Sequence, residues 1–355
     1  MFESRDSEYL NLLRGASVIR VMLVHLGLSW FYPPFSYYIG VFLPILFFVS
    51  GAVSFENYLR KPFGIYFTKR ITGLWIPFFQ LAVPVVLIFS ARQLKADPAS
   101  LVSWFLLWPD RSLFPFPIAQ IWFINVLLLL VIISAPIFPF LYRSRTTWFA
   151  AGLACYCFLT LIFNSSDVVS VFSASQIVTA LRLPKQLHQT FALAQFFFLG
   201  ALYYKKPNQV PKIFLAVLCL ITLLPGLYLS CLNSGCKNVP AAIDGRSANY
   251  ILLAYAVIFA LLLGRDMLLH LINRITLFKS LLLFASRNSY SLFLLHPLVL
   301  FLIERGLNMK NLSGNYLLAI IRLILVVSIT MFLSIPYSAL TRLISKYVSK
   351  IWVRG

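Results

Sequence analysis

Two polar side chains, Arg14 and His25, interrupt the first long apolar segment of the sequence, LLRGASVIRVMLVHLGLSWF. Eleven residues of α-helix make about three turns, so both side chains share one face and lie about 16 Å apart along the axis. A guanidinium binds phosphate through its planar fork of donors, and an imidazole can remove a proton from a hydroxyl near neutral pH. Within lipid, such a pair indicates a polar cavity.

The elements that must position this pair are membrane-spanning helices. Hydrophobic residues make up 60% of the 355 residues and charged residues 11%, whereas soluble domains carry about 25% charged residues. Apolar segments of about 20 residues, long enough to cross a bilayer, recur along the whole chain. The sequence therefore predicts an all-α, polytopic integral membrane protein that forms a single membrane-embedded domain over residues 1–355.

Ten membrane spans are expected, by length and apolar character. They cover residues 12–31, 38–57, 73–91, 119–141, 147–164, 188–204, 212–231, 249–265, 281–303 and 316–341. Segment 168–182 is ambiguous between a re-entrant piece and an eleventh span. Segment 266–280 alternates apolar and polar residues and is expected to be an interfacial amphipathic helix.

The loop charges give this topology a direction. With a cytoplasmic N-terminus, seventeen Lys and Arg residues fall on the cytoplasmic side and nine on the other side. This positive-inside bias predicts that both termini are cytoplasmic. It also accounts for most of the formal charge of +20, so the basic composition does not indicate nucleic-acid binding.

Basic and imidazole side chains, rather than carboxylates, are the ionisable groups expected inside the membrane: Arg14, Arg20, His25, Arg287, His296 and Arg322. Proton-coupled transporters usually depend on intramembrane carboxylates, so their absence at mid-membrane disfavours a transporter. His25 and His296 are expected at similar depths, which favours one shared site. Arg322 is interpreted as a side chain that snorkels to the headgroups.

The five cysteines indicate no metal site. Cys231 and Cys236 flank a loop that the topology places outside the cytoplasm, where an oxidising compartment would allow a disulfide between them. The other three, which are Cys155, Cys157 and Cys219, are expected to be small packing residues within spans. Ser50 and Gly51 are likewise expected to permit close helix packing.

Six segments, in order, resemble the membrane-bound acyltransferase-3 family. The opening signature is Arg14-Gly15 followed by His25, with ten residues between Arg and His. The later segments are FFVSG at 47–51, FTKRITGLWIP at 67–77, QIWFI at 120–124, FFFLGALYY at 196–204 and SYSLFLLHPLVL at 289–300. The resemblance covers nearly the whole chain, with one departure: many members carry Asp where this chain has Asn11.

The resemblance implies an enzyme of the bacterial inner membrane that transfers an acyl group, usually acetyl. The donor would be cytoplasmic acyl-CoA, used as a co-substrate with no bound cofactor, and the acceptor a hydroxyl of a cell-surface glycan or a lipid-linked sugar. Two alternatives stay open beside this interpretation. One is a transporter or flippase for a sugar or acyl compound, and the other is a non-catalytic partner in a glycan-assembly complex.

Within this interpretation, Arg14 near the cytoplasmic end would hold the donor, and His25 would act on the acceptor hydroxyl. His25 could serve as general base or carry the acyl group covalently, and the sequence does not separate these mechanisms. The remaining candidates are Lys69 and Arg70 for CoA phosphates, Arg287, Tyr290 and His296 for the developing oxyanion, and Trp122 for stacking on a sugar.

Overall fold

A computed structural model describes residues 4–26, 43–90, 121–164, 185–205, 210–234, 247–309, 312 and 315–354. All regular elements in these ranges are α-helices, as predicted. They are α1 (Ser4–His25), α3 (Leu43–Arg60), α4 (Phe63–Ser90), α6 (Ile121–Arg143), α7 (Thr146–Asn164), α10 (Lys185–Lys205), α11 (Lys212–Ser234), α12 (Ala248–Leu263), α13 (Arg265–Arg274), α14 (Thr276–Arg287), α15 (Ser289–Gly306) and α16 (Tyr316–Arg354).

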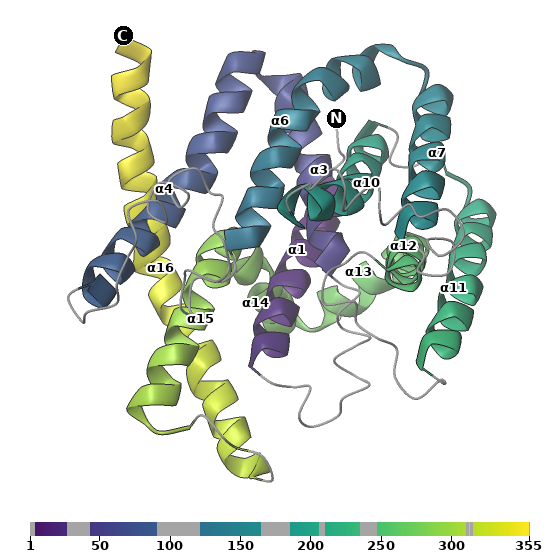
Figure 1. Cartoon of the computed structure of the whole chain (residues 1–355). Coiled ribbons are helices and arrows are strands. Elements are labelled where there is room, and N and C mark those ends of the chain that lie inside the picture. Colours follow the sequence, from purple (N-terminus) through teal and green to yellow (C-terminus); the bar gives the residue numbers. More distant parts are fainter. Residues whose placement is uncertain are drawn as a thin grey trace.

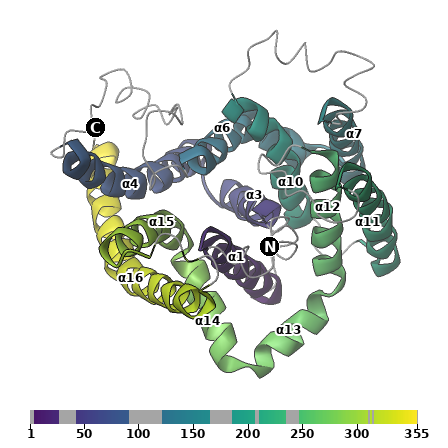
Figure 2. The same cartoon turned by 60° about the horizontal axis from the view of Figure 1, so that its bottom comes forward.

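Helix α1 lies in the interior of the molecule. Figure 2 shows α1 and α3 enclosed by the other helices, with α4 and α6 on one side and α14, α15 and α16 on another. Helix α1 packs directly against α14, α3 and α15. The start of α1 and the end of α16 lie toward the same side of the molecule (Figure 1). The helix that carries Arg14 and His25 is therefore surrounded by protein, which makes its polar side chains tolerable within an apolar molecule.

Glycines permit the closest helix contacts. A Cβ atom added to Gly51 on α3 would come within 1.7 Å of the backbone oxygen of Phe197, and one added to Gly200 on α10 within 1.8 Å of that of Phe48. A Cβ atom at Gly15 would similarly meet the backbone oxygen of Leu282 on α14, at 2.0 Å. The expectation that Gly51 permits close helix packing is confirmed, and Gly15 permits the close approach of α1 to α14 in the same way.

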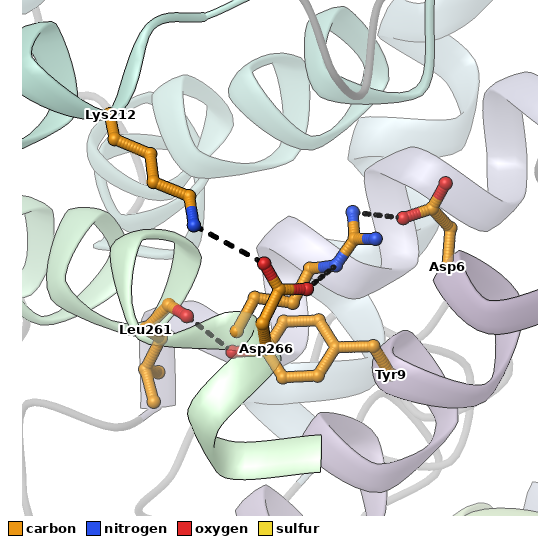
Figure 3. Close-up of polar contacts among 6 residues, drawn as sticks. Asp6, Tyr9, Lys212, Leu261 and Asp266 are labelled. Carbon is orange, nitrogen blue, oxygen red and sulfur yellow. Dashed lines mark hydrogen bonds and ion pairs between the residues drawn. The ribbon is translucent and has the colours of Figure 1, made fainter. Parts of the chain in front are cut away.

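A polar network fastens the start of α1 to helices that come much later in the chain (Figure 3). Asp6, which is fully buried, forms an ion pair with Arg265 at the start of α13. Asp266 accepts from Lys212 on α11 at 3.4 Å, and the Tyr9 hydroxyl donates to the Leu261 carbonyl at 2.5 Å. The contacts of Asp6 and Tyr9 fix the start of α1 to α12 and α13.

Three described helices are long and apolar enough to cross a membrane: Phe123–Arg143, Lys212–Leu232 and Tyr316–Val348. Helices α12 and α13 pass the same test together but are bent by 68°, which makes up to four. Each of the ten expected spans overlaps a described helix, but that all ten cross a membrane stays a prediction, and the expected span 281–303 is wrong in one respect. A turn at Asn288 separates α14 from α15, so the apolar run is broken.

The expected amphipathic segment 266–280 also proves to be two helices, because α13 ends at Arg274 and α14 begins at Thr276. Most of α13 is exposed, with Leu269 its buried residue. The ambiguous segment 168–182 lies outside the described residues.

Candidate active site

His25 and His296 form a hydrogen-bonded pair. His25 is the last residue of α1, and His296 lies near the middle of α15, 271 residues later in the chain. Nδ1 of His25 is 2.7 Å from Nε2 of His296, and the two rings are stacked with an interplanar angle of 17°. His296 is fully buried, whereas His25 is exposed. The structure thus brings the two imidazoles together at one site, as the sequence predicts.

The partners of His296 determine where the protons of the neutral pair reside. Nδ1 of His296 is 3.0 Å from the Leu292 carbonyl oxygen. Because a carbonyl oxygen only accepts, that nitrogen must carry a proton, and Nε2 of a neutral His296 is then an acceptor. It follows that Nδ1 of His25 is the donor between the rings, so Nε2 of His25 keeps its lone pair. The exposed member of the pair thus presents a basic nitrogen.

Arg322 holds the end of α1 that carries this pair. Its guanidinium contacts the Glu304 carboxylate at 2.6 Å and the Met309 carbonyl at 3.0 Å, and it donates to the Leu26 carbonyl at 3.2 Å. The carbonyls in the last turn of a helix have no partner within the helix, so Arg322 serves as a cap from α16. With 1% exposure, Arg322 does not snorkel to a surface, and that interpretation is wrong.

A cavity of about 230 Å³ lies beside the middle of α1, where Arg14 and Val18 line it. Five helices contribute to its wall: α1, α3, α4, α6 and α15. Its basic lining residues are Arg14, Lys69 and Arg70, the three that the sequence assigns to the donor. The structure therefore brings the predicted donor residues together around one cavity.

These cations have no carboxylate around the cavity to neutralise them. None of the described lining residues is acidic. Arg14 and Arg70 are close enough for their charges to act on each other. Nε and Nη2 of Arg70 are buried without a hydrogen-bond partner among the described residues, although Arg70 also interacts with Tyr66. Like charges held together away from water, with unused donors, favour an anionic ligand.

A second cavity, of about 340 Å³, shares Arg14, Ser289 and Tyr290 with the first. Arg287 and Asn11 also line it. The Tyr290 hydroxyl donates to the Leu74 carbonyl at 2.8 Å, so its proton is already engaged. Arg287 and Tyr290 thus lie at the Arg14 end of the site and not beside the histidine pair, whereas His296 contacts His25 directly.

Other predicted residues fall outside what the structure describes. Trp122 belongs to α6, but its side chain is not among those described. Cys231 is disulfide-bonded, and Cys155, Cys157 and Cys219 are free. The expected partner of Cys231, which is Cys236, lies outside the described residues, so the pairing stays a prediction.

Sequence reasoning missed the role of Arg322, the Leu292 carbonyl and two phenylalanines. Arg322 was recognisable as a lone cation in an apolar segment, but its partner Glu304 comes from a different helix. The Leu292 carbonyl is a backbone group, without any signal in the side chains. Phe123 and Phe293 line the cavity, and Phe293 lies about one helical turn before His296, whose ring it contacts.

Comparison with known proteins identifies the family of the chain. Searches against curated proteins and against solved structures find no match. A family profile described as an acyltransferase domain matches residues 7–339, which include Arg14, His25, the whole cavity lining and His296. This membrane protein, with its basic cavity and its histidine pair joined by α1 and α15, therefore belongs to the acyltransferase-3 family.

Proposed function

We propose that this protein is an integral-membrane O-acyltransferase. It transfers an acyl group, acetyl in the first instance, from cytoplasmic acyl-CoA to a hydroxyl of a cell-surface polysaccharide or its lipid-linked precursor. In this proposal the chain is one domain of ten spans in a bacterial inner membrane, with both termini in the cytoplasm.

The observation that carries the proposal is that α1 and α15 each contribute to both ends of one path. Helix α1 carries Arg14 at the cavity and His25 at the pair, and α15 carries Tyr290 at the cavity and His296 at the pair. Arg14 and His25 are separated by about 16 Å of helix rise. An elongated donor with phosphates at one end and a thioester at the other matches such a path.

His25 is proposed to act as a general base through Nε2. The acceptor hydroxyl gives its proton to this nitrogen while its oxygen forms a bond to the thioester carbonyl carbon. The carbon–sulfur bond then breaks, and the CoA thiolate takes the proton back from His25, which leaves free CoA and an ester. The His296 ring holds the orientation of His25 and stabilises the imidazolium that forms between these steps.

The geometry favours a base over a covalent carrier, because the hydrogen bond from Nδ1 of His25 to His296 prepares His25 to hold a proton. Intact-mass measurement of the purified protein after incubation with acetyl-CoA alone checks this choice. We expect the mass to stay unchanged. A gain of one acetyl group that is lost in a His25→Ala variant would assign the covalent route instead.

The reaction itself is tested by mass spectrometry of surface glycans from cells with and without the protein. We expect glycans from producing cells to carry additional acetyl groups. His25→Ala is expected to abolish them at normal protein level, because general-base catalysis contributes about 10²–10⁴-fold in rate. His270→Ala is the matched control, since His270 is exposed on α13, away from the pair. Unchanged acetylation in the His25→Ala cells would overturn the proposal.

A further inference from the structure

The second cavity, of about 340 Å³, has an almost entirely polar lining. Leu283 is the one apolar side chain among its described lining residues. Arg14 and Arg287 bring two positive charges to it, and none of the described lining residues is acidic. Because a cavity of this composition would be a poor site for an apolar molecule, it is suited to an anion.

The carboxylates that come before this cavity on α1 are already paired. Asp6 and Glu8 each form an ion pair with a basic residue that does not line the cavity. The next polar position on the helix that lines it, Asn11, carries an amide and adds no negative charge. The positive charges of Arg14 and Arg287 are therefore available to a bound anion.

Asn11 adds a hydrogen-bond donor to these charges. Its Oδ1 accepts from the Ser286 hydroxyl at 3.3 Å, which leaves the amide Nδ2 to donate. The hydroxyls of Tyr290 and Ser291 are engaged with α4 and α16, whereas the Ser289 hydroxyl adds a further donor to the lining. A phosphate monoester, with three free oxygens and a charge of about −1.5 to −2 at pH 7, matches such a set of donors.

Along α1, the second cavity lies farther from the histidine pair than the first. Asn11 and Arg14 line the second cavity, whereas Arg14 and Val18 line the first. His25 ends the helix beyond Val18. In an acyl-CoA the pantetheine chain joins the thioester to the diphosphate, and the 3′-phosphate on the ribose lies beyond the diphosphate. A donor whose thioester reaches His25 thus presents its groups in the same order as the two cavities.

We propose that the second cavity binds the 3′-phosphate of the acyl-CoA donor through Arg287 and Asn11. Arg14 then lies between this phosphate and the diphosphate at the first cavity. The inference rests on the proposed function, because it assumes an acyl-CoA donor whose thioester reaches His25. It gives Arg287 a role in donor recognition, and it requires the protein to distinguish CoA from 3′-dephospho-CoA, which lacks only that phosphate.

Binding measurements test this without knowledge of the acceptor. The purified protein, in nanodiscs of phosphatidylcholine, is titrated with CoA and with 3′-dephospho-CoA. For the unaltered protein we expect 3′-dephospho-CoA to bind about 10–100-fold more weakly, because hydrogen bonds between charged groups are lost. In Arg287→Gln the ratio of the two dissociation constants is expected to fall toward one.

Arg274→Gln is the matched control. Arg274 and Arg287 are both exposed and lie in the last turns of successive helices, α13 and α14, but Arg274 does not line the cavity. Its variant should keep the ratio of the unaltered protein. Arg70→Met should weaken the binding of both ligands and also keep the ratio, because Arg70 lines the first cavity and not the second.

Asn11→Asp tests the cavity from α1. The two side chains have nearly the same shape, but the change replaces the amide donor with a negative charge. We expect a lower ratio, with little change in thermal unfolding. If Arg287→Gln does not fold, Asn11→Asp still provides the comparison.

Two failures are distinguishable. If the unaltered protein binds CoA and 3′-dephospho-CoA equally well, or if Arg287→Gln and Asn11→Asp keep its preference, the second cavity does not bind the 3′-phosphate and the proposed function stands. If the unaltered protein binds neither ligand, the donor assignment fails, and the inference about the second cavity fails with it.

Discussion

Arginine occurs at both ends of the path along α1, in two opposite environments. At the histidine end, Arg322 contacts a carboxylate and two carbonyls, from Glu304, Met309 and Leu26. At the cavity end, Arg14 and Arg70 line one cavity, with no acidic residue in the described lining. Burying a cation costs free energy unless a partner compensates it. The charge of Arg322 is compensated within the protein, whereas the charges of Arg14 and Arg70 are left for a ligand to compensate.

Of the variants that test these two arginine environments, Arg322→Met is expected to have the largest effect on stability. Removal of one partner from a buried ion pair leaves an uncompensated charge on Glu304, and we expect the free energy of unfolding to fall by about 3 kcal/mol. Thermal unfolding in nanodiscs measures the change. Arg305→Met is the control. Arg305 follows Glu304 in the chain, is exposed, and stacks over Phe301. An Arg322→Met protein as stable as the control would show that the two arginine environments do not differ.

Arg70→Met should have the opposite pattern. Replacement of an uncompensated cation by an apolar side chain is expected to leave stability unchanged or higher. The affinity for CoA should fall about 10–100-fold, since a hydrogen bond to a charged group contributes about 1.5–3 kcal/mol. Isothermal titration with CoA measures the affinity, and Arg60→Met, in an exposed pair with Glu56, serves as control. A destabilised Arg70→Met protein with normal affinity would assign Arg70 to the structure.

Glu304→Gln tests how much the negative charge of Glu304 contributes to the contacts of Arg322. The amide keeps an oxygen that can accept from Arg322, and the carbonyl contacts with Leu26 and Met309 stay. We therefore expect a loss of about 1 kcal/mol, smaller than that of Arg322→Met. Thermal unfolding of both variants and of the double variant gives the coupling between them. Equal losses in the two single variants would mean that the carbonyl contacts contribute nothing.

Lys69→Ala should have the smallest effect. Lys69 lines the cavity but is exposed, and exposed ion pairs contribute about 0.2–1 kcal/mol. CoA affinity is expected to fall less than about fivefold at low salt, and the difference should vanish at high ionic strength. A loss as large as that of Arg70→Met would show that Lys69 is buried against the ligand.

The sequence predicted the helices well, because long apolar segments have few alternatives in lipid. The family resemblance assigned Arg14, Lys69 and Arg70 to the donor, and these three residues line one cavity. The expectation that His25 and His296 meet came only from their similar depths in the membrane. The turn at Asn288 was missed, since no glycine or proline marks it. Arg322 was misjudged for a different reason: whether a cation snorkels or is capped depends on a carboxylate from another helix, and one sequence contains no record of that pairing.

The central position of α1 has a consequence for how the protein is made. His25 is synthesised 271 residues before His296, an interval of roughly 15–55 s at 5–20 residues per second. Throughout that time Arg14 and His25 lack α14 and α15, the helices that enclose them in the finished fold. Helix α1 is made before the other described helices but is among the last to have its packing completed. Its polar face must be tolerated by the insertion machinery or by lipid until α14 and α15 have been made.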